Sequence, residues 1–175
     1  MLTGARNGYT LVEVMVTLAI FAMLLAMGVP SMRGFLENGR IRAAGEAWKY
    51  GLTLARNEAV RLNVQVEFVA DDTGWQVRRV ADGTVLHRGT GREGPADLTI
   101  TMDPEDSDRV TFDAFGRTVT TNPSDGTMPL VQVDIASARP PDTLNYQPLR
   151  LQLLAGGLTR LCNPAAEADD PRACL

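Results

Sequence analysis

The sequence predicts an α+β fold in which one long N-terminal helix packs on an antiparallel β-sheet. Three features predict it: an apolar run over residues 9–30, apolar residues at helical spacing as far as residue 62, and alternating apolar and polar residues from residue 64 onward. The chain has 175 residues, and 45% of them are hydrophobic. This length and composition suit one globular domain preceded by a membrane segment.

Residues 9–30 form the first half of the predicted helix, and their composition predicts a membrane span. The run is apolar apart from two threonines and Glu13, and as a helix it would be about 33 Å long, close to the thickness of a bilayer core. The alternative is a cleaved secretory signal peptide, with Arg6 as its basic end and residues 26–28 as its cleavage site. However, the run is longer than a signal-peptide core, and a carboxylate inside it costs about 2.5–3.5 kcal/mol on insertion scales. We therefore expect a spanning helix in which Glu13 has a function.

Residues 31–62 form the second, amphipathic half of the same helix. Apolar and small residues recur every three or four positions and make one stripe, whereas the charged residues mostly fall outside it. The small residues predict close packing of the helix on the sheet. One helix from Tyr9 to Leu62 would be about 80 Å long, with a bend near Gly28–Pro30. The stripe consists of Ala44, Ala47, Trp48, Gly51, Leu54, Ala55, Ala59 and Leu62.

Residues 63–175 are predicted to form a β-rich globular domain. Apolar and polar residues alternate after residue 63, and turn sequences such as Asp82-Gly83 separate the runs. Gly116-Arg117 and Gly156-Gly157 are predicted hairpin turns. The predicted strands are Val64–Phe68, Trp75–Val80, Val85–His87, Leu98–Met102, Arg109–Phe115, Pro129–Ile135, Leu149–Leu154 and Leu158–Cys162.

Two cysteines lie close together near the C-terminus. Cys162 and Cys174 would close a short loop, and a bonded pair suits an oxidising compartment. We expect a disulfide, worth about 3 kcal/mol by loop entropy, with two free thiols as the alternative. His87 is the only histidine and lies far away in the sequence, which argues against a metal site.

Charge and side-chain chemistry argue against several classes of function. The formal net charge is −4, so the chain has no overall basic field for nucleic acid or an anionic membrane surface. His87 has no nucleophile near it in the sequence. The acidic stretch at residues 103–108 lacks the EF-hand pattern. We expect neither an enzyme nor a bound cofactor or metal ion.

A short motif lies at the start of the apolar run. The sequence Gly8-Tyr9-Thr10-Leu11-Val12-Glu13, behind a leader containing Arg6, resembles the type IV prepilin signal. The resemblance implies that residues 1–8 are a leader peptide and that prepilin peptidase cuts between Gly8 and Tyr9. It also implies that the same enzyme methylates the new amine of Tyr9. The family usually has phenylalanine at the position of Tyr9.

The resemblance also gives Glu13 a role in assembly. A cation at the Tyr9 amine and an anion at Glu13 are each costly in lipid, and pairing between neighbouring helices neutralises both. We expect this pair to fix the axial register of assembly. Counting positive charges alone would leave the domain in the cytoplasm, because Arg33, Arg40 and Arg42 follow the span. The resemblance instead implies a single-pass protein of the bacterial inner membrane with a periplasmic domain.

Three later stretches resemble the GspH/FimT-type minor pilins. They are residues 55–63, 112–117 and 157–164. The resemblance implies the type IV pilin fold and a low-copy subunit that helps to initiate a type IV pilus. Its implied partners are prepilin peptidase, other pilins or pseudopilins, and the inner-membrane assembly platform. The alternative is the H-type minor pseudopilin of a type II secretion system, although the cysteine-closed tail looks more like the FimT/FimU side of the family.

Some FimT-type pilins capture DNA, and they carry Gly-Arg-x-Arg near the C-terminus. This chain keeps the glycine and the second arginine, Gly157 and Arg160, but loses the first arginine. Arg117 and Arg150 are further candidates for DNA contact, whereas acidic residues crowd the C-terminal tail. Because non-specific affinity for DNA grows with the number of phosphates neutralised, DNA binding is possible but not favoured.

Overall fold

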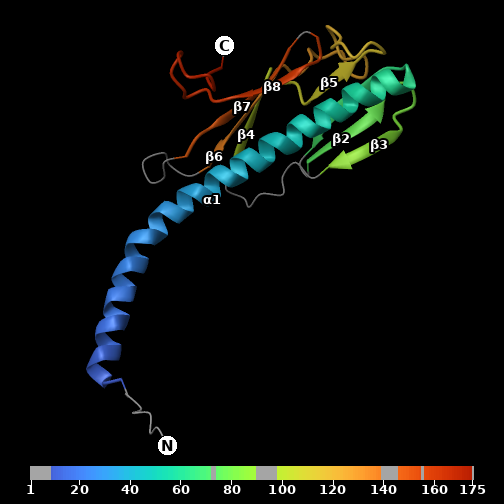
Figure 1. Ribbon diagram of the computed structural model, residues 1–175. Helices are drawn as coiled ribbons and strands as arrows, with labels where there is room; N and C mark the ends of the chain where they lie inside the picture. The colour runs from blue at the N-terminus through green and yellow to red at the C-terminus, as the bar shows by residue number, and fades with distance from the viewer. Residues whose placement is uncertain (1–8, 72–73, 90–97, 139–145, 155, 175) are drawn as a thin grey trace, which may run out of the picture.

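Figure 1 shows the computed structural model of the protein. The structure describes residues 9–71, 74–89, 98–138, 146–154 and 156–174, and it describes the backbone alone for residues 26–33. We call residues 63–175 the head and the N-terminal part of the helix that projects from the head the stem.

One helix, α1 (Leu11–Leu62), provides both the stem and a support for the head. Thr10 caps its N-terminus, and Asn63 caps its C-terminus in the left-handed conformation, with φ 54°. The helix stays unbroken through Pro30. The sequence predicts a bend near residues 28–30, and the helix axis curves between the stem and the part packed on the head (Figure 1).

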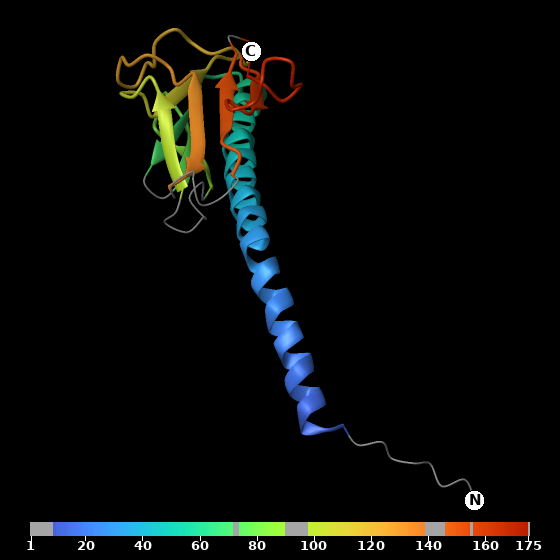
Figure 2. The same cartoon turned by 90° about the vertical axis from the view of Figure 1, so that its left-hand side faces the viewer.

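The described part of the head consists of two antiparallel four-stranded sheets. The first sheet has the order β3-β2-β1-β5 and the second has the order β4-β6-β7-β8. The strands of the first sheet are β1 (Val66–Asp71), β2 (Gly74–Arg79), β3 (Val85–Gly89) and β5 (Arg109–Phe112). Those of the second are β4 (Leu98–Asp103), β6 (Gln132–Ser137), β7 (Leu149–Leu153) and β8 (Thr159–Cys162). Figure 2, turned by 90° from Figure 1, shows the head gathered at one end of the helix and the stem extending away from it.

The hydrophobic core lies between α1 and the inner faces of both sheets. In the first sheet Phe68 is in register with Val77 on one side and Val110 on the other, and all three are fully buried. In the second sheet Ile135 and Leu151 belong to the same core and are also buried. One helix therefore supports both sheets, which explains why its stripe of apolar residues is long.

Glycines of α1 allow the helix to approach the sheets closely. A Cβ added at Gly51 would lie 2.6 Å from the Trp75 ring and 2.8 Å from the Phe68 ring. A Cβ added at Gly45 would overlap the Leu149 side chain. The close packing predicted from the small residues is thus present on both sheets.

The structure refines the predicted β-structure in three places. The sequence predicts an antiparallel sheet packed on the helix, and the structure has this arrangement with the strands divided into two sheets. The first strand begins at Val66 and not at Val64, because the Val64 N–H still donates to the Ala59 carbonyl at the helix end. The strand predicted over Arg109–Phe115 ends at Phe112, because the Asp113 side chain accepts the Phe115 and Arg117 N–H groups and forms a turn.

The other boundaries differ by smaller shifts. The strand predicted over Pro129–Ile135 is displaced to Gln132–Ser137, since the Leu130 and Val131 N–H groups donate to Arg109 and Asp103. The Gly156-Gly157 turn connects β7 to β8, as predicted. The Gly116-Arg117 turn also folds the chain back, through an isolated antiparallel bridge between Phe112 and Thr118, before the chain continues toward β6 in the other sheet.

Within the part of the chain that the structure describes, no helix has an apolar stretch of the length that crossing a membrane requires. The predicted span reaches residue 30, and the side chains of residues 26–30 lie outside the described ones.

Candidate functional site

The helix N-terminus brings Tyr9 and Glu13 to the far end of the stem. Thr10 Oγ1 accepts the backbone N–H of Glu13 at 3.2 Å and so caps the first turn. Glu13 therefore lies in that turn, where the helix dipole favours a negative charge. No described residue forms an ion pair with the Glu13 carboxylate. Gly8 and the rest of the predicted leader lie outside the described residues.

The stem presents an apolar surface from Tyr9 to Leu25. Every side chain in this stretch is exposed, including Leu11 at 76% and Met23 at 75%. An apolar surface of this extent is rare on a monomeric soluble protein and marks a contact with a partner or a membrane. The stem is thus a surface that needs lipid or other helices around it.

Three stretches that are far apart in the sequence meet at the opposite end of the molecule. The Arg56 Nε–H, from the end of α1, donates to the Gly116 carbonyl oxygen at 2.9 Å. A Cβ added at Gly157 would overlap that same oxygen. The two glycines have φ of 76° and 75°, so both occupy the left-handed region that favours glycine. The stretches 55–63, 112–117 and 157–164, each a weak motif alone, therefore form one contact.

The sequence reasoning did not identify Arg56 as an important residue. Its partner is a backbone carbonyl 60 positions away, and no periodicity signals such a bond. The only available signal was that the three motifs occurred together in one chain.

A disulfide joins Cys162, at the end of β8, to Cys174 in the tail. The two Cα atoms are 5.0 Å apart, and no described cysteine is free. The Asn163 N–H donates to the Arg172 carbonyl at 2.7 Å and ties the same tail to the end of β8. The C-terminal segment is thereby fixed against the second sheet.

The three candidate arginines for DNA contact are all engaged with other groups. Arg150 forms a two-point salt bridge with Asp134, at 2.7 and 3.0 Å, and this hydrogen bonding raises the pKa of Arg150. Arg160 donates to the Ala173 carbonyl at 3.2 Å. Arg117 pairs with Asp113 at 2.9 Å.

Two of these arginines lie close together and the third lies elsewhere. Arg150 is in register with Cys162, and Gln152 with Arg160, so Arg150 and Arg160 share the face of the second sheet that turns away from α1. Arg117 lies in the turn after β5, which belongs to the first sheet. The structure thus brings together a pair of arginines, each already bonded within the protein.

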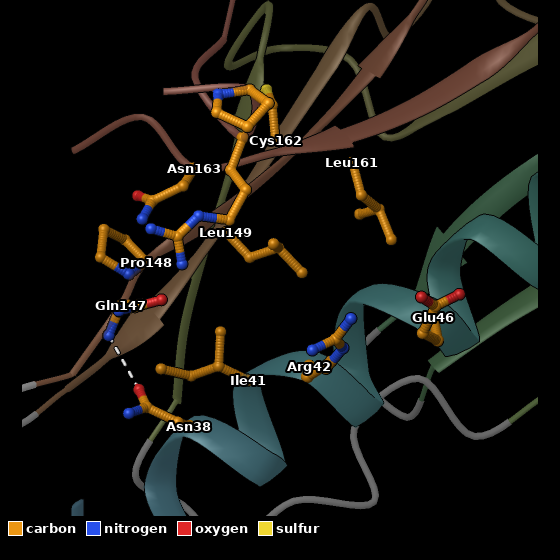
Figure 3. Close-up of a pocket in the computed structure, with 12 residues that line it drawn as sticks. Asn38, Ile41, Arg42, Glu46, Gln147, Pro148, Leu149, Leu161, Cys162 and Asn163 are labelled. Carbon is orange, nitrogen blue, oxygen red and sulfur yellow. Dashed lines mark hydrogen bonds between the residues drawn. The ribbon is translucent and has the colours of Figure 1, made fainter. Parts of the chain in front are cut away.

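A groove of about 330 Å³ lies between α1 and the start of β7 (Figure 3). Ile41, Leu149 and Leu161 give it an apolar floor, and the Gln147 N–H donates to Asn38 Oδ1 across it at 2.8 Å. The lining residues include no histidine or serine that would pair as a nucleophile and base. The groove lies between the helix and the tail, whose Pro171 and Arg172 also line it.

Ionisable groups at the C-terminal end of α1 form structural pairs with each other and with β3. His87 Nε2 lies 3.3 Å from Glu58 Oε1, and Arg61 donates to Glu58 Oε2 at 2.6 Å. The hydrogen bond from Arg61 is the main reason why the pKa of Glu58 is lowered. No group of three His, Cys, Asp or Glu side chains in the described residues could hold a metal ion.

Comparison with known proteins identifies the family. The profile of the family described as type II transport protein GspH matches residues 44–140. That of the prokaryotic N-terminal methylation motif matches residues 4–29. The two matches overlap neither each other nor the C-terminal tail, so they are independent. No protein with a curated function matches the sequence significantly.

Solved structures show the same fold. The chain is similar to the type IV minor pilin FimU of Pseudomonas aeruginosa, with a TM-score of 0.57, 20% identity, and coverage of 75% of this chain and 98% of FimU. It is also similar to the minor pseudopilin EpsH of the type 2 secretion system of Vibrio cholerae, with a TM-score of 0.50, 17% identity, and coverage of 73% and 99%. Because the GspH profile covers more than half of the sequence, the chain belongs to the GspH family of minor pilins and pseudopilins, and it carries the N-terminal methylation motif.

Proposed function

We propose that this chain is a minor pilin, a low-copy subunit that helps to initiate assembly of a type IV pilus. Prepilin peptidase would remove residues 1–8 and methylate the amine of Tyr9. Residues 9–30 would then hold the protein in the bacterial inner membrane, with the head in the periplasm, until the subunit enters the filament. The observation that carries the proposal is the methylation motif placed at the start of a helix whose apolar stem is exposed.

The assembly step depends on Glu13. Cleavage after Gly8 creates a cationic amine at Tyr9, four residues before the Glu13 carboxylate. Each charge is costly in an apolar environment unless it is paired. The Tyr9 amine of one subunit would pair with Glu13 of its neighbour, so that two stems dock only in the register that neutralises both charges.

The partners follow from this route. They are prepilin peptidase, the inner-membrane assembly platform, and other pilins or pseudopilins whose stems cover the apolar surface from Tyr9 to Leu25. The same anchor and fold would also serve the minor pseudopilin of a type II secretion system. The tail closed by Cys162 and Cys174 favours the pilus.

Direct capture of DNA remains a separate and less favoured prediction. Phosphate contacts by Arg117, Arg150 or Arg160 would compete with the partners that these side chains already have. A gel-shift assay with the full chain in detergent at low salt tests it. A shift that Arg160→Gln abolishes would support DNA capture, and the lack of any shift at micromolar protein would remove it.

The proposed function is tested by counting surface pili in a strain that lacks only this gene, by shearing and electron microscopy. We expect pili to be lost, and to be restored by the wild-type gene but not by Glu13→Ala. Normal pili in the deletion strain would move the assignment to type II secretion or DNA capture.

Processing has its own measurement. Intact-mass analysis of the membrane-extracted protein should show the loss of residues 1–8 and the gain of one methyl group. A mature chain that begins near Val29 would instead show that the apolar run is a cleaved signal peptide.

A further inference from the structure

A group of exposed apolar side chains lies at the end of the head remote from the stem. It consists of Val60 at 50% exposure, Phe115 at 76%, Leu154 at 48% and Leu158 at 57%. We call these four residues the apical patch. They come from the end of α1, the turn after β5 and the turn between β7 and β8, all of which lie away from the helix N-terminus (Figures 1 and 2).

The apical patch is held together by specific contacts. A Cβ added at Gly116 would lie 3.1 Å from Val60 Cγ2, and one added at Gly157 would overlap the Gly116 carbonyl oxygen. The Arg56 Nε–H donates to that oxygen, and the Leu154 N–H donates to the Leu158 carbonyl at 2.9 Å. The backbone that carries these side chains is thus fixed before any partner arrives, which lowers the entropic cost of docking.

The exposed charge beside the apical patch is positive. Arg61 and Arg117 are each 65% exposed, whereas the carboxylates they pair with, Glu58 and Asp113, are 10% and 23% exposed. The guanidinium groups therefore lie outermost and the acids lie beneath them. An approaching surface would meet an apolar centre with a basic rim, which favours an apolar and acidic partner.

The polarity of the molecule decides how a partner is oriented. Two apical patches placed face to face would form a closed dimer with stems pointing in opposite directions, and both stems could not then enter one membrane. A partner anchored in the same membrane must present the lower end of its head, where the head meets the stem. Such a contact joins unlike surfaces and continues along a filament.

A second copy of this chain fits that contact poorly. Its own stem–head junction has exposed apolar residues, Phe35 at 76% and Leu36 at 53%. However, the neighbouring Arg40 is 42% exposed above the buried Glu37, and Arg42 is also exposed, with the exposed Glu46 one turn further along α1. Stacked copies would therefore bring Arg40 and Arg42 toward Arg61 and Arg117, and this opposition of like charges is unfavourable.

We propose that the apical patch is the docking surface for the stem–head junction of a different pilin-fold subunit, one whose junction is apolar and acidic. The proposal rests on the proposed function, because it requires that both chains are anchored in one membrane. It assigns the three converging motifs a role in recognition, with Arg56 as a positioning residue that holds the patch in shape.

The test uses a photo-crosslinking amino acid in the full-length chain in its host membrane. p-Benzoylphenylalanine replaces Phe115 in one strain and Tyr50 in another. Tyr50 is a matched control, because it is an aromatic residue of 63% exposure on the flank of the helix. We expect the probe at position 115 to give a covalent adduct severalfold stronger than that at position 50. The adduct should contain a second protein with a processed, methylated N-terminus, linked through the region where its helix leaves its head.

A second experiment places the crosslinking amino acid at position 158 and measures how much the apolar Phe115 side chain contributes to docking. Phe115→Glu should strongly weaken the adduct formed from position 158, whereas Tyr50→Glu should leave it unchanged. Phe115 is so exposed that its replacement does not disturb the core.

The outcomes separate docking from the proposed function. A processed and methylated chain that gives no adduct from position 115, or an adduct with a second copy or with a protein that has no pilin signal, overturns the docking alone. A chain that keeps residues 1–8 and gives no adduct overturns both.

Discussion

Gly157 and Gly83 both have positive φ, at 75° and 68°, but their surroundings differ. A Cβ at Gly83 would meet open space, whereas one at Gly157 would overlap the Gly116 carbonyl oxygen. Gly83→Ala should therefore cost about 1 kcal/mol of backbone strain, and Gly157→Ala about 1–3 kcal/mol more through the clash. Denaturation of the detergent-solubilised chain, followed by tryptophan fluorescence, measures both. If both substitutions lower the free energy of unfolding by the same amount, the close contact at Gly157 does not contribute to stability.

Glu58 is the residue whose protonation should weaken the head in acid. The hydrogen bond from Arg61 lowers the pKa of Glu58 below its unfolded value. The ionised Glu58 therefore contributes fully to the free energy of unfolding above its pKa in the unfolded chain. This contribution is lost as the pH falls through its pKa in the folded protein. Glu58→Gln should cost about 1 kcal/mol at neutral pH, and this difference should vanish in acid. Denaturation between about pH 7 and pH 3 measures it.

The control for that series is Glu105→Gln, which replaces an exposed carboxylate with no described partner. It should follow the wild type at every pH. A Glu58→Gln difference that stays constant in acid would mean that packing, and not the ion pair, accounts for the loss.

At the scale of elements, α1 contains two glycines with opposite expected effects. Gly39 has open space where a Cβ would go, so Gly39→Ala should stabilise the helix by about 0.5–1 kcal/mol. A Cβ at Gly51 would crowd the Trp75 and Phe68 rings at 2.6–2.8 Å, and overpacking of this kind costs about 1–3 kcal/mol. Gly51→Ala should therefore destabilise the protein, by the cost of overpacking less the gain in helix propensity expected for Gly39→Ala. Stabilisation by both substitutions would contradict the close packing of α1 on the first sheet.

The elements also show what the sequence can predict and what it cannot. The helix was predictable almost to its last residue, because the apolar stripe and the change of period at residue 62 are both local signals. The division into two sheets was not, because strands with the same alternation pair equally well in one sheet or in two. The strand predicted to end at Phe115 fails for a local reason, since the Asp113 side chain forms a turn within an apolar run. At the site, the spacing of the motif points to Tyr9 and Glu13, whose roles stay predictions, whereas the contact of Arg56 with Gly116 depends on tertiary folding.

At the scale of the whole molecule, the head and the tip of the stem are independent. The core consists of residues from Ile41 onward, and Glu13 lies in the first turn of α1, remote from it (Figure 2). A change at Glu13 should therefore affect assembly without affecting the stability of the head. This separation allows a loss of filaments to be attributed to the missing charge.

Glu13→Gln and Thr10→Val make the decisive pair for the charge-pairing mechanism. Glu13→Gln removes the anion and keeps the size of the side chain. Thr10→Val removes the cap that accepts the Glu13 N–H, which costs about 1 kcal/mol at the helix end, but it keeps the anion. If the carboxylate neutralises the amine of a neighbour, Glu13→Gln should strongly reduce the amount of this subunit in sheared filaments, whereas Thr10→Val should keep most of it. Both variants should melt at the wild-type temperature and lose residues 1–8 normally. Equal reductions would instead indicate that assembly depends on the order of the first helical turn and not on the charge of Glu13.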